Sequence, residues 1–169
     1  GSEIGIGMMD LIGALLLTQF VGIPFSLLFG RFGGRIGTKR AIVLGLGWYT
    51  LIACAGYFMR VAWHFWVLAF AVGMVQGGTQ ALSRSLFGLM VPKARSAEFY
   101  GFYDVSSKIA GIAGPALFAL VGQLTGSSRL SIVALIVFFI GGALLLTRVD
   151  EREGIKVAGV ENARMAAAA

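Results

Sequence analysis

Polar side chains recur along one side of an otherwise apolar stretch near the middle of the chain. At the 100° rotation per residue of an α-helix, Gln76, Gln80 and Ser83 fall on one stripe, and Arg84 lies at its edge. Such groups can hold a small polar solute by hydrogen bonds or join helices within a membrane, and both interpretations stay open for the two glutamines. No nucleophile–base set, metal-ligand cluster or phosphate-binding loop accompanies them. The sequence therefore predicts no enzyme activity, no cofactor and no metal.

A second polar stripe follows further along the chain. Asp104 and Lys108 stand four residues apart with the acid first, which is the favourable order for an ion pair on a helix, and Ser107 lies beside them. A charge within a bilayer costs roughly 2.5–3.5 kcal/mol. This pair is therefore expected to face a wet or polar interior rather than lipid.

The two stripes are expected to lie at similar depths in the bilayer. With a rise of about 1.5 Å per residue, Gln76 lies about 15 Å from a boundary at Trp66, and Lys108 lies about 15 Å from one at Glu98. Both depths are near the midplane of a bilayer core about 30 Å thick. Arg84 lies about 27 Å from Trp66 and is expected to anchor the helix at the far interface. The predicted substrate or proton pathway is lined by Gln76, Gln80, Ser83, Asp104, Ser107 and Lys108.

Five apolar blocks must position these side chains. A membrane-spanning helix needs about 20 predominantly apolar residues. Only helices satisfy every backbone group locally in lipid, so we predict an all-α integral membrane fold for residues 1–149. Residues 150–169 are expected to form a solvated or frayed cytoplasmic tail. The five predicted helices are Met8–Gly30, Ala41–Met59, Phe65–Met90, Ala97–Leu124 and Leu130–Thr147.

The composition agrees with a membrane protein. Of the 169 residues, 57% are hydrophobic and only 13% are charged, whereas soluble domains carry about 25% charged residues. The formal net charge of +6 suggests nucleic acid in a soluble protein. Here the cations lie between the apolar blocks, so membrane topology explains them better and no nucleic-acid partner is expected.

The distribution of cations predicts the orientation. Basic residues concentrate in cytoplasmic loops. Alternate connections carry most of them, which places the N-terminus outside and the C-terminus in the cytoplasm. The basic connections hold Arg31, Arg35, Lys39 and Arg40, then Lys93 and Arg95, then Arg148, Arg152 and Lys156, whereas the opposite side has only Arg60 and Arg129.

Local signals set the helix boundaries and contacts. Pro92 is expected to end the third helix, because proline cannot continue the backbone hydrogen-bond ladder. Ser96 is expected to be the N-cap of the fourth helix. Small surfaces suited to close helix contact are predicted at Gly73, Gly77 and Gly78 and at Gly111 and Gly114.

The first basic connection, GRFGGRIGTKR at residues 30–40, resembles the loop signature of the major facilitator superfamily. Gly30, Arg35, Gly37, Lys39 and Arg40 match it, while Gly34 stands where the signature has an aspartate and Thr38 replaces a usual basic residue. In that superfamily the signature follows the second helix of each six-helix half. The resemblance therefore implies that the first block is the eighth of twelve helices.

A narrower resemblance covers most of the chain. The stretches QFVGIPFSLLFGR, GGTQALSRSLFGLMVPKARSAEFYGFYDVSSKIAGIAGP and QLTGSSRLSI are similar to bacterial relatives of the autophagy-related vacuolar amino-acid effluxers. This resemblance implies a secondary transporter, with amino acids as the leading substrate class. Facilitators rock two halves around a central site, so the chain is expected to be a fragment or one part of a larger assembly.

Two functions remain open at this point. The favoured one is the C-terminal portion of a secondary active transporter for a small polar metabolite in a bacterial inner membrane. Blocks one, three and four would line its cavity, and blocks two and five would be peripheral. Its expected partners are the lipid bilayer, a small-molecule substrate and the missing N-terminal half or another membrane subunit. The alternative is a membrane scaffold or assembly subunit that transports nothing.

Overall fold

The structure is a computed structural model that describes residues 7–167. The side chains of residues 128 and 129, including the Arg129 cation expected in an outer connection, lie outside the described part. Within it there is no strand, which confirms the all-α prediction, and five helices are long and apolar enough to cross a membrane. The elements are α1 (Met8–Ile36), α2 (Thr38–Tyr57), α3 (Ala62–Leu89), the 3-10 turn η2 (Lys93–Arg95), α4 (Ser96–Thr125), α5 (Ser128–Arg148) and α6 (Glu151–Ala167).

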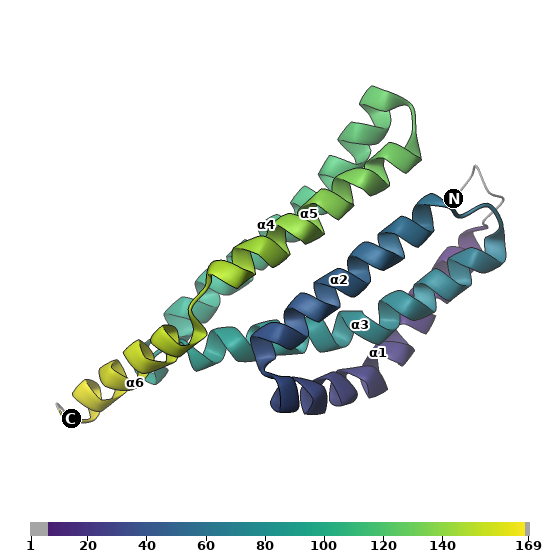
Figure 1. Ribbon diagram of the computed structural model, residues 1–169. Coiled ribbons are helices and arrows are strands. Elements are labelled where there is room, and N and C mark those ends of the chain that lie inside the picture. The colour runs from purple at the N-terminus through teal and green to yellow at the C-terminus, as the bar shows by residue number, and fades with distance from the viewer. Residues whose placement is uncertain (1–6, 168–169) are drawn as a thin grey trace.

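The first predicted connection is mostly helical. α1 continues through the basic segment as far as Ile36, and α2 begins at Thr38, so Gly37 alone separates them. Gly37 has φ 95°, a backbone conformation that costs glycine little and other residues more. Helix α1 also changes direction along its length (Figure 1), and it contains Pro24, which removes a backbone hydrogen bond and favours a bend.

The start of α4 differs from the prediction. Ser96 is the first helical residue rather than the N-cap, which is Arg95, and no side chain caps this end. Pro92 precedes the short turn η2, whose last residue Arg95 forms hydrogen bonds of 2.9–3.1 Å with the Glu98 carboxylate. The 3-10 turn supplies backbone bonds of its own, so the helix begins without the serine cap.

Helices α1 and α3 form the most extensive contact in the described chain. Their backbones approach at glycines, since a Cβ on Gly77 would lie 2.8 Å from the carbonyl oxygen of Gly22 and one on Gly73 would lie 2.9 Å from that of Thr18. The Thr18 hydroxyl also donates to the carbonyl of Ala69 at 3.2 Å. Small residues allow this close packing in membranes, as predicted for Gly73 and Gly77.

The main buried cluster lies on the other side of α3, against α2. Ala41, Ile42, Leu82 and Leu86 form it. Helix α2 also packs against α5, where the rings of Tyr49 and Phe139 stack with centroids 5.3 Å apart. Helices α4 and α5 run side by side (Figure 1). The polar stripe of α3 is therefore left on the side away from α2.

Lys39 of the loop signature joins α2 to the end of α5. Its ammonium group donates to the carbonyl oxygens of Thr147 and Val149 at 2.9 and 2.7 Å. A helix C-terminus leaves carbonyls without partners and carries partial negative charge. One signature cation therefore caps a helix that lies more than one hundred residues away in the sequence.

The segment after α5, expected to be a solvated or frayed tail, is largely exposed but helical rather than frayed. Residues Glu151–Ala167 form helix α6, which is mostly exposed but buries Ala158. The Asn162 side chain accepts a 2.8 Å hydrogen bond from the backbone N–H of Lys93, and Gly154 lies against Met90. α6 thus packs on the turn between α3 and α4, and this contact stabilises a segment whose composition alone predicts little order.

Candidate substrate cavity

The polar stripe of α3 faces an open cavity of about 910 Å³. All of its lining residues come from α1, α3 and α4. These are the three helices expected to line the substrate cavity, and no residue of α2 or α5 is in its lining. The lining combines hydroxyl, amide, guanidinium and small apolar groups, and it comprises Thr18, Gln19, Gly22, Ile23, Ser26, Gln76, Gly77, Gln80, Ala81, Arg84, Tyr103, Ser107 and Ala110.

The cavity brings together half of the predicted pathway residues. Gln76, Gln80 and Ser107 line it. Ser83 and Lys108 are outside its lining, and Lys108 is exposed on α4 with no hydrogen bond or ion pair to any described residue. The stripe of α3 borders this space through Gln76 and Gln80, whereas α4 presents Ser107 to it rather than Asp104 or Lys108.

The predicted ion pair between Asp104 and Lys108 is wrong. Asp104 instead accepts a 3.0 Å hydrogen bond from Nη2 of Arg84, across from α3 to α4. A pair four residues apart on one helix gains only about 0.2–0.5 kcal/mol, so a guanidinium that reaches across from another helix can displace it. Arg84 is also more than the interfacial anchor predicted from its depth, because it lines the cavity.

An aromatic cluster surrounds this inter-helix pair. The Arg84 guanidinium lies 5.9 Å from the centre of the Tyr103 ring, within cation–π range. Tyr103 and Tyr100 of α4 both contact Phe87 of α3, with ring centroids 4.9 and 5.6 Å apart. The α3–α4 contact therefore consists of side chains, and the backbones of the two helices make little contact.

Sequence reasoning assigned the first block to the cavity but named none of the residues that α1 contributes. Thr18, Gln19 and Ser26 add a hydroxyl, an amide and a second hydroxyl to the cavity. Thr18, Gly22 and Ser26 recur every four residues, the spacing of one helix face. The same test that identified Gln76 and Gln80 would have found them, had it been applied to the first block.

The described residues hold no cluster of three or more His, Cys, Asp or Glu side chains that could bind a metal ion. The available chemistry is that of hydrogen bonding and one cation held beside one carboxylate. A concave space of this size with a few convergent polar groups suits the binding of a small polar molecule.

Comparison with known proteins shows the family. The profile described as "Vacuole effluxer Atg22 like" matches residues 1–159. The chain belongs to the vacuole effluxer Atg22-like family. This confirms the resemblance read from the three sequence stretches and makes the chain an integral membrane protein of a transporter family.

Curated relatives of this Atg22-like chain include bacterial and fungal proteins. It is 40% identical over 162 residues to an uncharacterized MFS-type transporter, YxiO, of Bacillus subtilis, covering 96% of this chain and 38% of the relative. It is 28% identical over 170 residues to autophagy-related protein 22 of Pichia angusta, covering 94% of this chain and 29% of that protein. The chain thus spans less than two fifths of either relative's length. No solved structure matches it.

Proposed function

We propose that this chain is the C-terminal portion of a secondary active transporter that moves a small polar metabolite by alternating access. Amino acids are the leading substrate class, as the resemblance to the vacuolar amino-acid effluxers implies, and the cavity offers groups for both ends of an amino acid. The observation that carries the proposal is the polar cavity between α1, α3 and α4. Its chemistry is that of solute binding rather than catalysis.

Arg84 is the group we assign to a substrate carboxylate. Its guanidinium has five N–H donors, and the bond to Asp104 uses Nη2. The remaining donors can bind a carboxylate within the cavity that Arg84 lines. Gln76, Gln80 and Ser107 would then orient the rest of the solute by hydrogen bonds.

The missing wall of the cavity defines the expected partner. Helices α1, α3 and α4 line the cavity, and it is open where no described residue covers it. In facilitators the substrate lies between two halves that rock against each other. We propose that the absent half, or another membrane subunit, closes this face. From the distribution of basic residues we also propose that the C-terminus lies in the cytoplasm and the N-terminus outside a bacterial inner membrane.

The open polar cavity supports a transporter over a scaffold. A scaffold would turn its polar stripes against another helix to satisfy them. Here Gln80 is exposed and Gln76 is half-buried at the cavity wall, and neither side chain has a hydrogen bond to a described residue. Such side chains are available to a solute.

Uptake by proteoliposomes containing the full-length protein tests this proposal. Gln76→Ala and Gln80→Ala are expected to lower amino-acid uptake at least tenfold in the linear range, because each removes hydrogen bonds to the solute. Gln123→Ala is the matched control, since Gln123 is an exposed glutamine of α4 outside the cavity lining. Full uptake by both cavity variants for every amino acid tested would refute the assignment.

The roles of the remaining predicted pathway residues are tested in the same uptake assay. Lys108→Ala tests whether the exposed cation of α4 contributes through a surface that the absent half covers, and Ser83→Ala tests the hydroxyl outside the lining. Arg84→Lys keeps the charge but removes the planar fork of donors. It is therefore expected to raise the KM for uptake while the abundance of the protein stays unchanged. Equal KM values for Arg84→Lys and the unmodified protein would remove Arg84 from the carboxylate site.

A further inference from the structure

A second hollow, unrelated to the polar cavity, lies between α1, α2 and α3. It has a volume of about 640 Å³, and its walls are almost entirely apolar. Its apolar lining includes Leu28, Phe29 and Phe32 of α1, Leu44 and Trp48 of α2, and Met74 and Val75 of α3. We call this hollow the α1–α2 groove. Leu28, Phe32, Leu44 and Trp48 are exposed at its surface, so no described segment covers it.

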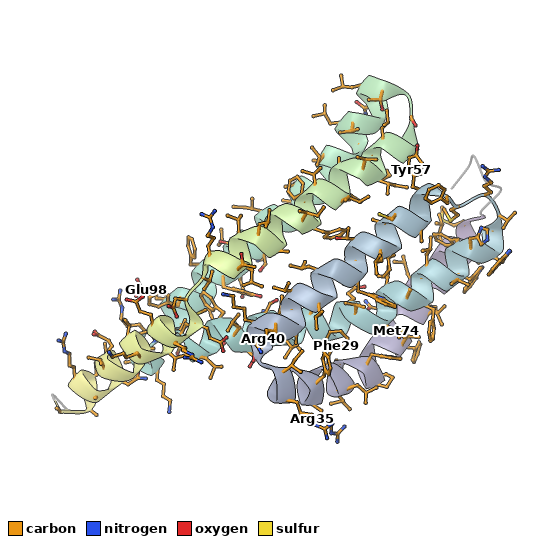
Figure 2. The ribbon with its side chains drawn as sticks, viewed as in Figure 1. Phe29, Arg35, Arg40, Tyr57, Met74 and Glu98 are labelled. Carbon is orange, nitrogen blue, oxygen red and sulfur yellow. The ribbon has the colours of Figure 1, made fainter. Side chains whose placement is uncertain are left out.

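Two arginines stand at one end of this otherwise apolar groove. Arg31 and Arg35 line it, and neither has a hydrogen bond or ion pair to a described residue. They are four residues apart and therefore share one face of α1. Figure 2 shows Arg35 at the end of α1, with its guanidinium directed away from the ribbons. Residues 30–40 contain no acidic side chain, so both charges lack a local counter-ion.

The other signature cations are directed elsewhere. Lys39 caps the carbonyls of α5, and Arg40 lines a different, polar hollow beside Thr147 and Asp150. Of the four cations in residues 30–40, only Arg31 and Arg35 therefore border the groove. The groove is apolar along its length and cationic at one end, which is the complement of an amphipathic anion.

The length of the groove fits one leaflet of a bilayer. On α1 the lining runs from Phe25 to Arg35, which is ten residues or about 15 Å at a rise of about 1.5 Å per residue. Half of a bilayer core about 30 Å thick is also about 15 Å. The arginines lie at the cytoplasmic end in the orientation proposed above, where anionic lipids give the membrane surface its negative potential.

We propose that the α1–α2 groove holds one anionic phospholipid of the cytoplasmic leaflet. Its phosphate is bound by Arg31 and Arg35, and one acyl chain lies along Leu28, Leu44 and Trp48. Arginine suits this role because its planar donors can bind two phosphate oxygens at once. The site depends on the proposed orientation but not on transport, so a failed uptake assay leaves it standing and a failed lipid assay leaves the transport proposal standing.

Native mass spectrometry of the full-length protein tests the charge of the headgroup. The protein is stripped of lipid and then given equal amounts of phosphatidylglycerol and phosphatidylcholine with identical acyl chains. One phosphatidylglycerol is expected to remain bound, with a preference on the order of tenfold, because each basic side chain near a headgroup contributes about 1 kcal/mol, roughly a factor of five. Equal retention of both lipids would show ordinary boundary lipid, and retention of neither would show a groove covered by protein. Either result overturns the proposal.

Paired variants test whether the preference belongs to this groove. The double variant Arg31→Gln with Arg35→Gln should abolish the preference for phosphatidylglycerol. The control is Arg148→Gln with Arg152→Gln, which removes the same charge from exposed cytoplasmic-side residues outside the groove and should preserve the preference. If both pairs lose the preference equally, the general surface charge explains it and the site does not exist.

A second pair tests the acyl-chain part without altering charge. Leu28→Trp should fill the groove and reduce the bound lipid at least threefold. Leu27→Trp makes the same change on the neighbouring residue, which is 65% exposed and outside the lining, and should have no effect. Equal lipid retention by these two variants would contradict a chain lying in the groove.

Discussion

The two contacts that α3 makes at the cavity are built in opposite ways. Against α1, backbone meets backbone at Gly22, Gly73 and Gly77. Against α4, long side chains bridge the helices through the Arg84–Asp104 pair and a group of aromatic rings. The first interface is packed by small residues, and the second is spanned by side chains that are half-exposed in the described chain.

This difference suggests which wall of the cavity can move. Close backbone packing has few alternative arrangements, because any displacement of α1 leaves a void or a clash. A side-chain bridge can open by rotamer changes, and an ion pair with 62% and 54% exposed side chains contributes little to stability. We therefore expect α1 and α3 to behave as one unit and α4 to change its distance from them.

The largest expected effect comes from breaking the glycine contact. In Gly77→Leu the new side chain would meet the carbonyl oxygen of Gly22 and the Ser26 Cβ, which lie 2.8 and 3.3 Å from the position of a Cβ. Overpacking of this kind costs about 1–3 kcal/mol or more. The midpoint of unfolding of the full-length protein in a denaturing detergent should fall clearly.

The control for this change is Gly47→Leu on α2. A Cβ on Gly47 meets nothing within 4 Å, and the residue is exposed, so its unfolding midpoint should stay within error of the unmodified protein. If Gly77→Leu unfolded no earlier than Gly47→Leu, the α1–α3 contact would not be close-packed, and the contrast with α4 would disappear.

A smaller effect on stability, but a larger one on geometry, is expected at the α3–α4 bridge. Arg84→Asp should lower the unfolding free energy by no more than about 1 kcal/mol, because the pair is half-exposed. It should nevertheless broaden the distance between spin labels placed on α3 and α4, since two carboxylates would then face each other. Pulsed electron spin resonance measures that distribution.

Charge reversal makes this test specific. Combining Arg84→Asp with Asp104→Arg restores one cation and one anion and should narrow the distribution again. Labels on α1 and α3 serve as the internal control and should report an unchanged distance in all three proteins. A broad distribution that persists in the double variant would mean that aromatic packing of Tyr100 and Tyr103 on Phe87, rather than charge, holds α4 in place.

The fold could be read from the sequence because lipid imposes a simple rule. Long apolar blocks must be helices, and the five blocks coincide with five helices whose ends differ from the prediction by a few residues. The exceptions depend on tertiary contacts. Residues 31–36 continue α1, and α6 forms against η2 and Met90. Neither apolar length nor local propensity reports such contacts.

The site was predictable in its stripes but not in its pairings. Helical spacing selected Gln76, Gln80 and Ser107, which line the cavity, but it also selected Ser83, Asp104 and Lys108, which do not. It could not show that Asp104 would bind Arg84 rather than Lys108, because an inter-helix partner is set by how α3 and α4 cross. Depth alone likewise assigned Arg84 to the interface, although its long side chain reaches the cavity.

The smallest expected effect separates packing from hydrogen bonding within the α1–α3 contact. The Thr18 hydroxyl donates toward Ala69 of α3 at 3.2 Å and toward Ala14 of its own helix at 2.8 Å. Thr18→Val keeps the shape but removes both bonds. Hydrogen bonds between membrane helices average about 0.6 kcal/mol, so the unfolding midpoint should fall only slightly and the α1–α3 label distance should not change.

Thr18→Ser is the matched control, because it keeps the hydroxyl and loses a methyl group. If the glycine contact holds α1 to α3, the valine and serine variants should both remain far more stable than Gly77→Leu. A loss in Thr18→Val as large as that in Gly77→Leu would mean that one hydroxyl fastens the two helices. The α1–α3 interface would then depend on a polar side-chain bridge, as the α3–α4 interface does, and α1 would be as free to move as α4.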